Sequence, residues 1–137
     1  CHEPVTLADL YPTLAGAGAP AAAAGMPGNA VDGIDLASLL KNPAAKLGRD
    51  ALFFHYPHYY ETTTPVSAVR AGEWKLLEYL EDGRLELFNL RDDPSEQSDL
   101  ALREPARAAA LRDRLDQWRR EVGAQLPAPN PAFKGKK

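Results

Sequence analysis

Four short segments rich in β-forming residues follow one another between residues 51 and 90, and they constrain the fold more than any other feature of the sequence. Two of them flank Asp82-Gly83, a dipeptide that favours the type I′ turn of a β-hairpin because both central residues of that turn need a positive φ angle. A second turn is expected at Ala71-Gly72-Glu73. The expected strands are residues 51–56, 66–70, 74–80 and 84–90. We therefore expect an antiparallel meander of the last three strands, with the first segment as a fourth strand.

A helix is predicted after this sheet, from Pro105 to Val122. Proline suits the first position of a helix, because its missing N–H would have no partner there, and Gly123 is a natural C-terminal cap. Apolar residues recur in steps of three and four, at Ala108, Leu111, Leu115, Trp118 and Val122. This stripe is expected to lie across one face of the sheet. The basic residues of the helix are expected on its solvated face, namely Arg107, Arg112, Arg114, Arg119 and Arg120.

The first third of the chain has short helical segments in place of strands. Apolar spacing predicts a helix within residues 5–14, with Thr6 as its N-cap. A second short helix is expected over residues 36–40, capped by Asp35. The Ala/Gly/Pro-rich residues 15–30 between them should end the first helix and are typical of an irregular surface loop.

These patterns divide the chain into two parts, residues 1–48 and residues 49–137. The predicted fold class is α+β: a small four-stranded antiparallel sheet packs on the C-terminal helix and is preceded by short helices. The chain starts at Cys1, without an initiator methionine or an apolar signal core. We therefore expect that it begins inside a longer protein, with any targeting segment upstream.

Composition excludes several classes of protein. With 45% hydrophobic and 26% charged residues, the chain of 137 residues is too apolar for a disordered tail. A net charge of −3 does not fit a general nucleic-acid binder, which needs a basic surface. The apolar runs are far shorter than the roughly 20 residues of a transmembrane helix. A single cysteine excludes an internal disulfide and a cysteine-ligated metal cluster.

The densest group of chemically versatile side chains is the segment from His55 to Tyr60, at the end of the first expected strand. Imidazoles and phenols offer donors, acceptors and flat faces that suit an anionic or sugar-like ligand. His55, His58 and Tyr59 are therefore candidate substrate-binding residues, together with Arg70, whose guanidinium could reach a bound anion. The alternative is that the tyrosines cap the core, the histidines are merely exposed and Arg70 forms a surface ion pair. A metal site is less favoured, because no third ligand lies at a matching spacing.

No complete catalytic set is visible along the chain. Ser67 and Ser95 lack the sequence context of a nucleophilic serine, and Cys1 has no partnered base. Asp92-Asp93 and Glu96 lack the glycine and the spacing of an EF-hand calcium loop. These carboxylates are more typical of turn and helix-cap residues.

Taken in order, the motifs of this chain resemble the late part of bacterial arylsulfatase-like enzymes of the alkaline-phosphatase superfamily. VTLADLYPTL at 5–14 and DGIDLASLL at 32–40 resemble the end of a sulfatase catalytic domain. The following motifs are similar to the C-terminal subdomain: HYPHY at 55–59, SAVRAGEWKLL at 67–77, EDGRLELFNL at 81–90, DPSEQ at 93–97, LDQW at 115–118 and PAPNP at 127–131. The resemblance covers nearly the whole chain, and its order is specific.

The resemblance implies a sulfatase that hydrolyses sulfate esters of small molecules or carbohydrates. In that family a formylglycine, made from a Cys/Ser-x-Pro-x-Arg motif, is the nucleophile, and Asp and Asn residues hold a divalent cation, normally calcium. This motif is absent, since Pro4 lies one position too late after Cys1 and no Arg follows. We therefore expect the nucleophile and metal ligands in a catalytic domain upstream, assign no catalytic or metal residue here, and expect the isolated chain to be inactive.

The same resemblance implies a place for each part of the chain. Residues 1–48 would be the tail of the α/β catalytic domain, and residues 49–137 the C-terminal subdomain. The loop of His55 and His58 would lie near the rim of the substrate pocket. The usual habit of bacterial sulfatases implies a periplasmic or secreted location.

Two alternatives remain at the level of sequence. One is a sister enzyme of the same superfamily, a phosphodiesterase or phosphonate hydrolase, which the upstream nucleophile motif would distinguish. The other is a non-catalytic module that docks or oligomerises. A chain separated from its catalytic domain should also expose apolar surface within its first forty residues, so self-association is expected.

Overall fold

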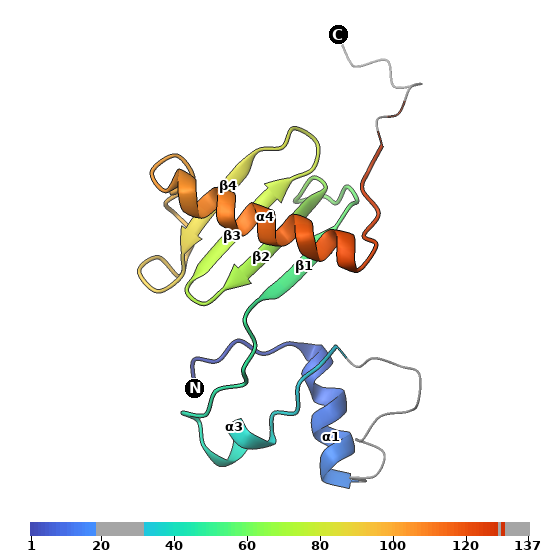
Figure 1. Ribbon diagram of the computed structural model, residues 1–137, viewed down its shortest axis with the longest axis vertical. Coiled ribbons are helices and arrows are strands. Elements are labelled where there is room, and N and C mark those ends of the chain that lie inside the picture. Colours follow the sequence, from blue (N-terminus) through green and yellow to red (C-terminus); the bar gives the residue numbers. More distant parts are fainter. Residues whose placement is uncertain (19–31, 129, 131–137) are drawn as a thin grey trace. The chain divides into compact units, whose positions relative to one another are not determined.

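The computed structural model describes residues 1–18, 32–128 and 130 of the chain. The chain divides into two compact units, Cys1–Arg49 and Asp50–Lys137. The first unit holds short helices and the second holds a sheet and one long helix (Figure 1). This arrangement confirms the predicted α+β class. None of the helices within the described residues is long and apolar enough to cross a membrane.

The second unit contains a four-stranded antiparallel sheet with the strand order β1-β2-β3-β4. The strands are β1 (Leu52–Tyr56), β2 (Val66–Ala71), β3 (Trp74–Tyr79) and β4 (Leu85–Asn89). Every strand pairs with its neighbour in sequence, so the expected meander with β1 as the fourth strand is confirmed. Strands β1 and β4 are the two edges of the sheet.

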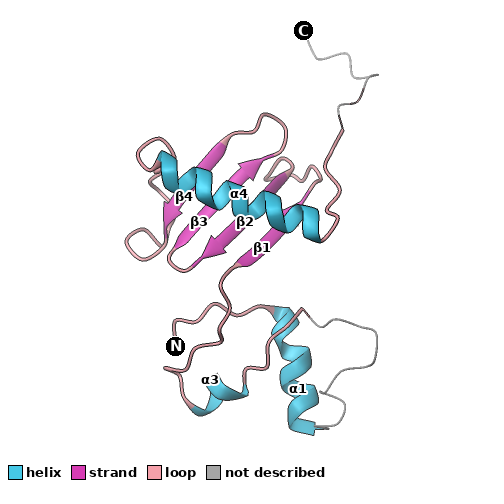
Figure 2. Cartoon of the chain, viewed as in Figure 1, coloured by secondary structure: helices cyan, strands magenta, loops and turns pink. Residues whose placement is uncertain are grey.

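Helix α4 (Pro105–Glu121) crosses one face of this sheet (Figure 2). Its stripe of small and apolar residues meets the inward side chains of the strands, which gives a core of Val69, Leu76, Leu87, Ala108, Leu111 and Leu115. Phe53 adds a parallel ring stack on Trp118, with centroids 5.0 Å apart. Val122 does not belong to the stripe, because the helix ends one residue earlier and this side chain is exposed. Gly123 follows with φ of 63°, the left-handed geometry of a C-terminal cap.

The predicted type I′ turn at Asp82-Gly83 is wrong. In the register of the β3–β4 hairpin, Glu78 pairs with Leu85, which leaves a longer loop than a two-residue turn. A type I′ turn needs positive φ at both central residues, and only Gly83 meets this condition, with φ of 73°. Asp82 does not, because Glu96 is the one non-glycine residue with positive φ in the described part of the chain. The N–H of Gly83 donates to the carbonyl of Tyr79, and a loop closed in this way needs positive φ only at its last residue.

The first unit contains η1 (Leu7–Asp9), α1 (Leu10–Gly18) and α3 (Ala37–Lys41). Helix α1 runs to Gly18, into the segment predicted as a loop, and the rest of that segment up to residue 30 lies outside the described residues. Asp35 is not the N-cap of α3, since Leu36 takes that position. Asp35 lies one residue before the N-cap, and its carboxylate accepts the N–H of Ala37 at 2.8 Å.

The first unit has little hydrophobic core of its own. Leu39 is the one apolar side chain classed as buried among its described residues, while Leu7 and Leu14 are 85% and 69% exposed. Its buried charged residue is Asp9, which is fully inaccessible. The unit is therefore held together mainly by polar contacts.

Candidate functional site

The predicted site begins where β1 ends, at Tyr56. The connection that follows carries His58 and Tyr59, both exposed, and then a tight turn that an isolated bridge between Tyr60 and Thr63 closes. The His58 ring lies edge-on to Tyr56, with centroids 5.6 Å apart. The Tyr59 hydroxyl donates to Glu81 at 2.9 Å.

The contact with Glu81 affects the protonation of the Tyr59 hydroxyl. Because the phenol donates to a carboxylate, that hydrogen bond raises the pKa of Tyr59 above its ordinary value. The hydroxyl therefore keeps its proton at neutral pH. With this proton donated to Glu81, the Tyr59 oxygen remains as an acceptor beside exposed aromatic faces, a combination that suits sugar hydroxyls.

His55 points to the opposite side of its strand from Tyr56, toward the face covered by α4. Its Nδ1 lies 2.7 Å from the hydroxyl of Ser67, and its Nε2 lies 2.8 Å from the carbonyl of Gln125. A carbonyl only accepts, so Nε2 carries a proton, and in the neutral ring Nδ1 accepts from the serine. Both ring nitrogens therefore have partners within the chain.

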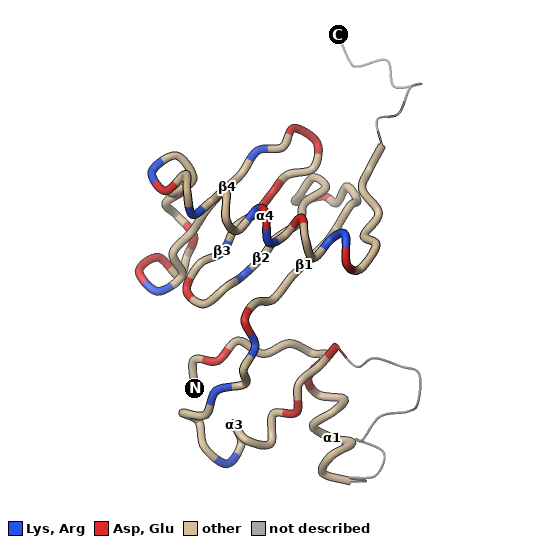
Figure 3. Tube along the Cα trace, viewed as in Figure 1, with Lys and Arg blue, Asp and Glu red and all other residues tan. Residues whose placement is uncertain are grey.

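Behind His55 lies a buried cluster of charges between the sheet and α4. Arg119 donates to Ser67 at 3.3 Å, to Glu78 and to Asp116. Glu78 also accepts from Arg112 at 2.9 Å. Both basic and acidic residues lie along α4 (Figure 3). Arg119 on this helix and its partner Glu78 on β3 are buried, with side chains only 7% and 6% exposed.

The prediction that Arg119 lies on the solvated face of the helix is therefore wrong. Arg119 follows Leu111 and Leu115 at a spacing of four, so it occupies the same stripe one turn further on. Burial by itself would lower the pKa of this guanidinium, but its hydrogen bonds to Asp116 and Glu78 outweigh burial and raise the pKa. The spacing of four, with polar Ser67 and Glu78 at inward strand positions, was the signal that sequence reasoning missed.

Arg70 lies on the other face of the sheet. It pairs in register with Leu52 and with Lys75, and it is three residues from inward-facing Ser67, so strand alternation turns its side chain away from α4. Among the described residues the Arg70 guanidinium has no hydrogen bond or ion pair, and its Nε is buried without a partner. The structure thus separates the four predicted residues: His58 and Tyr59 share a loop, His55 faces the helix, and Arg70 faces away from it.

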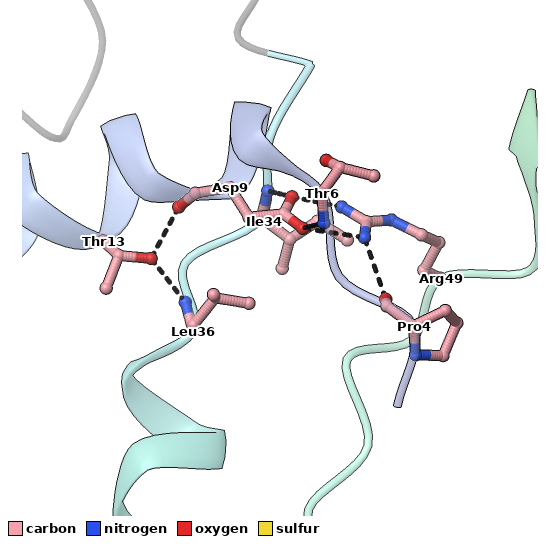
Figure 4. A network of polar contacts seen from close by, with 7 residues as sticks. All are labelled: Pro4, Thr6, Asp9, Thr13, Ile34, Leu36 and Arg49. Carbon is pink, nitrogen blue, oxygen red and sulfur yellow. Dashed lines mark hydrogen bonds and ion pairs between the residues drawn. The ribbon is translucent and has the colours of Figure 1, made fainter. Parts of the chain in front are cut away.

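A second polar network lies in the first unit, centred on Asp9 (Figure 4). The Asp9 carboxylate accepts the N–H of Thr6 at 2.7 Å, the N–H of Ile34 at 2.9 Å and two donors of Arg49, one of them at 2.9 Å. The hydrogen bonds from Arg49 hold the pKa of this carboxyl well below its usual range. All its partners lie within the unit, so the network is structural.

Two further contacts bring residues 32–36 against α1. The Thr13 hydroxyl donates to the Asp9 carbonyl at 2.6 Å and accepts the N–H of Leu36 at 2.9 Å. A side chain at Gly33 would begin 2.1 Å from the carbonyl oxygen of Ala8, so this position admits only glycine. The motifs of residues 5–14 and 32–40 are thus two halves of one packing arrangement.

Neither a metal-ligand cluster nor an obvious anion site adds to these two networks among the described residues. No group of three His, Cys, Asp or Glu side chains able to hold a metal ion occurs within residues 1–18, 32–128 and 130. A groove of about 560 Å³ runs beside the start of α4, with Leu85, Leu102 and Ala108 in its lining. Its cations Arg84 and Arg112 are ion-paired with Glu86 and Glu78.

Comparison with known proteins gives these contacts a family context. A family model described as N-sulphoglucosamine sulphohydrolase, C-terminal, matches residues 5–121. Among solved structures, one described as "a putative sulfatase" from Bacteroides thetaiotaomicron is 27% identical with a TM-score of 0.68, covering 90% of this chain and 27% of its own. No curated protein matches the sequence.

Two other solved structures are similar over most of this chain. BT1596, described as a 2-O GAG sulfatase, is 26% identical with a TM-score of 0.64, covering 88% of this chain and 27% of its own. BT4656, solved with its substrate D-glucosamine-2-N,6-O-disulfate, is 18% identical with a TM-score of 0.62, covering 84% and 24%, and this likeness concerns the fold alone. The chain therefore spans about a quarter of the length of these structures.

Proposed function

The chain belongs to the sulfatase family described as N-sulphoglucosamine sulphohydrolase, C-terminal, and from this premise we propose that it is the C-terminal part of a longer sulfatase that hydrolyses sulfate esters of carbohydrates. The observation that carries this proposal is the family match over residues 5–121. The preference for carbohydrate is supported by the similar structure described as a 2-O GAG sulfatase. In this proposal the first unit is the tail of the catalytic domain and the second unit is the C-terminal subdomain.

The reaction centre belongs, in this proposal, to the part of the protein that precedes Cys1. A formylglycine would supply the nucleophile there, and a calcium ion would stabilise the charge of the sulfate group. The described residues of this chain do not fit such a cation, because they contain no suitable group of His, Cys, Asp or Glu ligands. The sequence also has no Cys/Ser-x-Pro-x-Arg motif, which supports the same division of labour. The isolated chain should accordingly release no sulfate.

The contribution of this chain would be substrate selection at the rim of the active site. His58 and Tyr59 are exposed on one loop, and the Tyr59 hydroxyl, whose proton is donated to Glu81, can accept a hydrogen bond from a sugar hydroxyl. His55 would act as a positioning residue, since its bonds to Ser67 and Gln125 anchor the strand end from which this loop departs. A periplasmic or secreted location is proposed with this function.

The test compares the complete polypeptide with the chain alone. Free sulfate is measured after incubation with sulfated glycosaminoglycan oligosaccharides, with a phosphodiester as the competing substrate. Sulfate release by the complete polypeptide only is expected. Phosphodiester hydrolysis in its place, release by the isolated chain, or the lack of an upstream Cys/Ser-x-Pro-x-Arg motif would overturn the proposal.

The rim residues are tested in the same assay. His58→Ala and Tyr59→Phe should raise KM several-fold and leave kcat nearly unchanged, because they remove ground-state contacts with the substrate. Tyr60→Phe is the matched control, since this neighbouring tyrosine is exposed on the same loop. Equal KM values for all three variants would exclude the loop from substrate binding.

A further inference from the structure

His55, Ser67 and Glu78 form one row across three neighbouring strands, on the sheet face that α4 crosses (Figure 2). Arg119 of α4 lies over this row, since its guanidinium donates to Ser67 at 3.3 Å and to Glu78. The row ends at the carbonyl of Gln125, which belongs to the segment that follows α4 and lies 2.8 Å from His55 Nε2. Every group in the row therefore belongs to the second compact unit.

The hydrogen bonds of this row run in one direction. A guanidinium has no acceptor, so the Ser67 hydroxyl accepts from Arg119 and uses its own proton as a donor. The acceptor within reach of that proton is His55 Nδ1, 2.7 Å away. With Nδ1 accepting, the proton of the neutral ring lies on Nε2, where it donates to Gln125. A cation at one end and a carbonyl at the other thus select the same tautomer of His55.

A second proton on the His55 ring does not fit this arrangement. It would place an N–H on Nδ1 toward the Ser67 oxygen, which already accepts from Arg119. The serine proton would then lose its acceptor among the described residues, and this hydroxyl belongs to a fully buried side chain. An unsatisfied buried donor is costly, and two cationic groups would also meet at one oxygen.

The charges around the row do not compensate for such a proton. Two acids and two arginines pair with one another between β3 and α4, namely Glu78, Asp116, Arg112 and Arg119. The other two neighbours of the ring, β2 and the segment after α4, contribute Ser67 and Gln125, which carry no charge. An imidazolium would therefore add a positive charge to a set that is already balanced.

We propose that this row is a pH-sensitive latch on the segment that follows α4. Arg119 acts through Ser67 as the positioning residue that keeps the His55 proton on Nε2, and His55 in that form holds Gln125 at the end of β1. Imidazole takes up a second proton in mildly acidic solution. The half-buried ring then leaves Ser67 for water, and Gln125 loses its donor. The latch is closed at neutral pH and open in acid.

Hydrogen–deuterium exchange of the complete polypeptide tests the latch. The amide of Ala124, which donates to the carbonyl of Arg119 at 2.9 Å, reports on the segment. Its protection, corrected for the intrinsic effect of pH on exchange, should fall by about tenfold between about pH 7.5 and about pH 5, the factor expected for one lost buried hydrogen bond. An unchanged protection in the wild type would overturn the proposal.

Histidine variants identify the titrating group. His55→Gln carries a side chain that takes up no proton, so it should lose the pH dependence. His58→Gln is the matched control, because it removes the other histidine of the second unit, and it should keep the pH dependence. Equal pH dependence in the wild type and His55→Gln, or its loss in His58→Gln, would refute the latch.

Serine variants test the positioning role of Arg119. Ser67→Ala removes the hydroxyl that joins Arg119 to the ring, so a protonated His55 can stay in place and the segment should remain protected in acid. Ser67→Thr keeps a hydroxyl and should restore the opening. Nitrogen-15 NMR of labelled histidine, with His55 assigned by its absence in His55→Gln, should show the proton on Nε2 at neutral pH. A proton on Nδ1, or acid opening in Ser67→Ala, would remove Arg119 from this role.

This inference goes beyond the proposed function and does not depend on it. Exchange and NMR need no substrate, whereas the sulfate assay measures chemistry. A polypeptide that opens in acid but releases no sulfate would refute the sulfatase activity alone, and sulfate release without acid opening would refute the latch alone.

Discussion

Replacement of Asp9 by asparagine tests what holds the first unit together. The side chain keeps its size, but the buried carboxylate loses its charge and one acceptor oxygen. Both oxygens are in use, because Oδ2 accepts from Thr6 and Arg49, and Oδ1 accepts from Ile34 and Arg49. In the variant the asparagine NH2 group takes the place of one of these oxygens, and because it is itself a donor it cannot accept their hydrogen bonds.

The expected loss exceeds what the rest of the unit can supply. Leaving one partner of a buried ion pair uncompensated costs about 3–5 kcal/mol, and the Arg49 side chain is 9% exposed. One lost backbone hydrogen bond adds about 1 kcal/mol. Against this, full burial of a leucine such as Leu39 contributes only about 1.5–3 kcal/mol. We therefore expect the first unit of Asp9→Asn to unfold while the second unit keeps its core.

Hydrogen–deuterium exchange read by mass spectrometry measures this directly. In the wild type the amides of Ile34 and Leu36 should be protected, because Asp9 and Thr13 accept their N–H groups. In Asp9→Asn this protection should vanish, with β2 to β4 unchanged. Asp35→Asn is the control, since it alters an exposed carboxylate with one hydrogen bond. Equal exchange of the two variants would refute the reasoning.

The pH dependence of the same comparison gives a second criterion. The ion pair with Arg49 lowers the pKa of Asp9 in the folded chain, so its stabilisation is complete above the unfolded pKa of about 3.9 and is lost as the pH falls toward the folded value. The stability difference between wild type and Asp9→Asn should therefore shrink as the pH is lowered from about 4 to about 2. A difference that stays constant over this interval would show that the carboxylate charge contributes nothing.

Four other predictions follow from the packing and from the proposed division of the protein. Gly33→Ala should abolish protection in the first unit, because the added Cβ would lie 2.1 Å from a carbonyl oxygen, whereas Gly18→Ala, with open space around it, should not. Leu115→Ala should lower the free energy of unfolding of the second unit by about 2–5 kcal/mol in urea titration, and Leu102→Ala, 96% exposed, by less than about 0.5 kcal/mol. A chelator should abolish sulfate release by the complete polypeptide without shifting the melting temperature of the isolated chain. The isolated chain should self-associate in sedimentation velocity, and a sharp monomer boundary at high concentration would contradict that expectation.

The sheet and its long helix could be predicted from the sequence because their signals are local. Runs of β-forming residues, a glycine in each of the last two hairpins and a proline at the start of the helix are all features of residues close in sequence. The hairpin at Gly83 shows the limit of such signals. The dipeptide correctly marked the loop, but the loop length follows from the strand register, which depends on how the whole sheet fills its face.

The buried charges could not be predicted in the same way. A charged side chain predicts a solvated position, so sequence alone groups Arg119 with the exposed arginines of the helix although its spacing puts it in the apolar stripe. Its burial depends on Glu78, 41 residues earlier, and on Ser67, 52 residues earlier. A lone arginine at a core position is costly, and only acids from distant strands make it acceptable. The site residues separated for a related reason, since His55 and Arg70 are near in sequence but lie on opposite faces of the sheet.

Several residues of the motifs that carry the family resemblance have a structural task inside the chain. Asp9, Thr13 and Gly33 join the two halves of the first unit, and Glu96 pairs with Lys75 on the sheet face that turns away from α4. These contacts explain why a resemblance assembled from such motifs identifies the fold. Arg70 is the exception, because it lies in one of the same motifs and its guanidinium has no partner among the described residues.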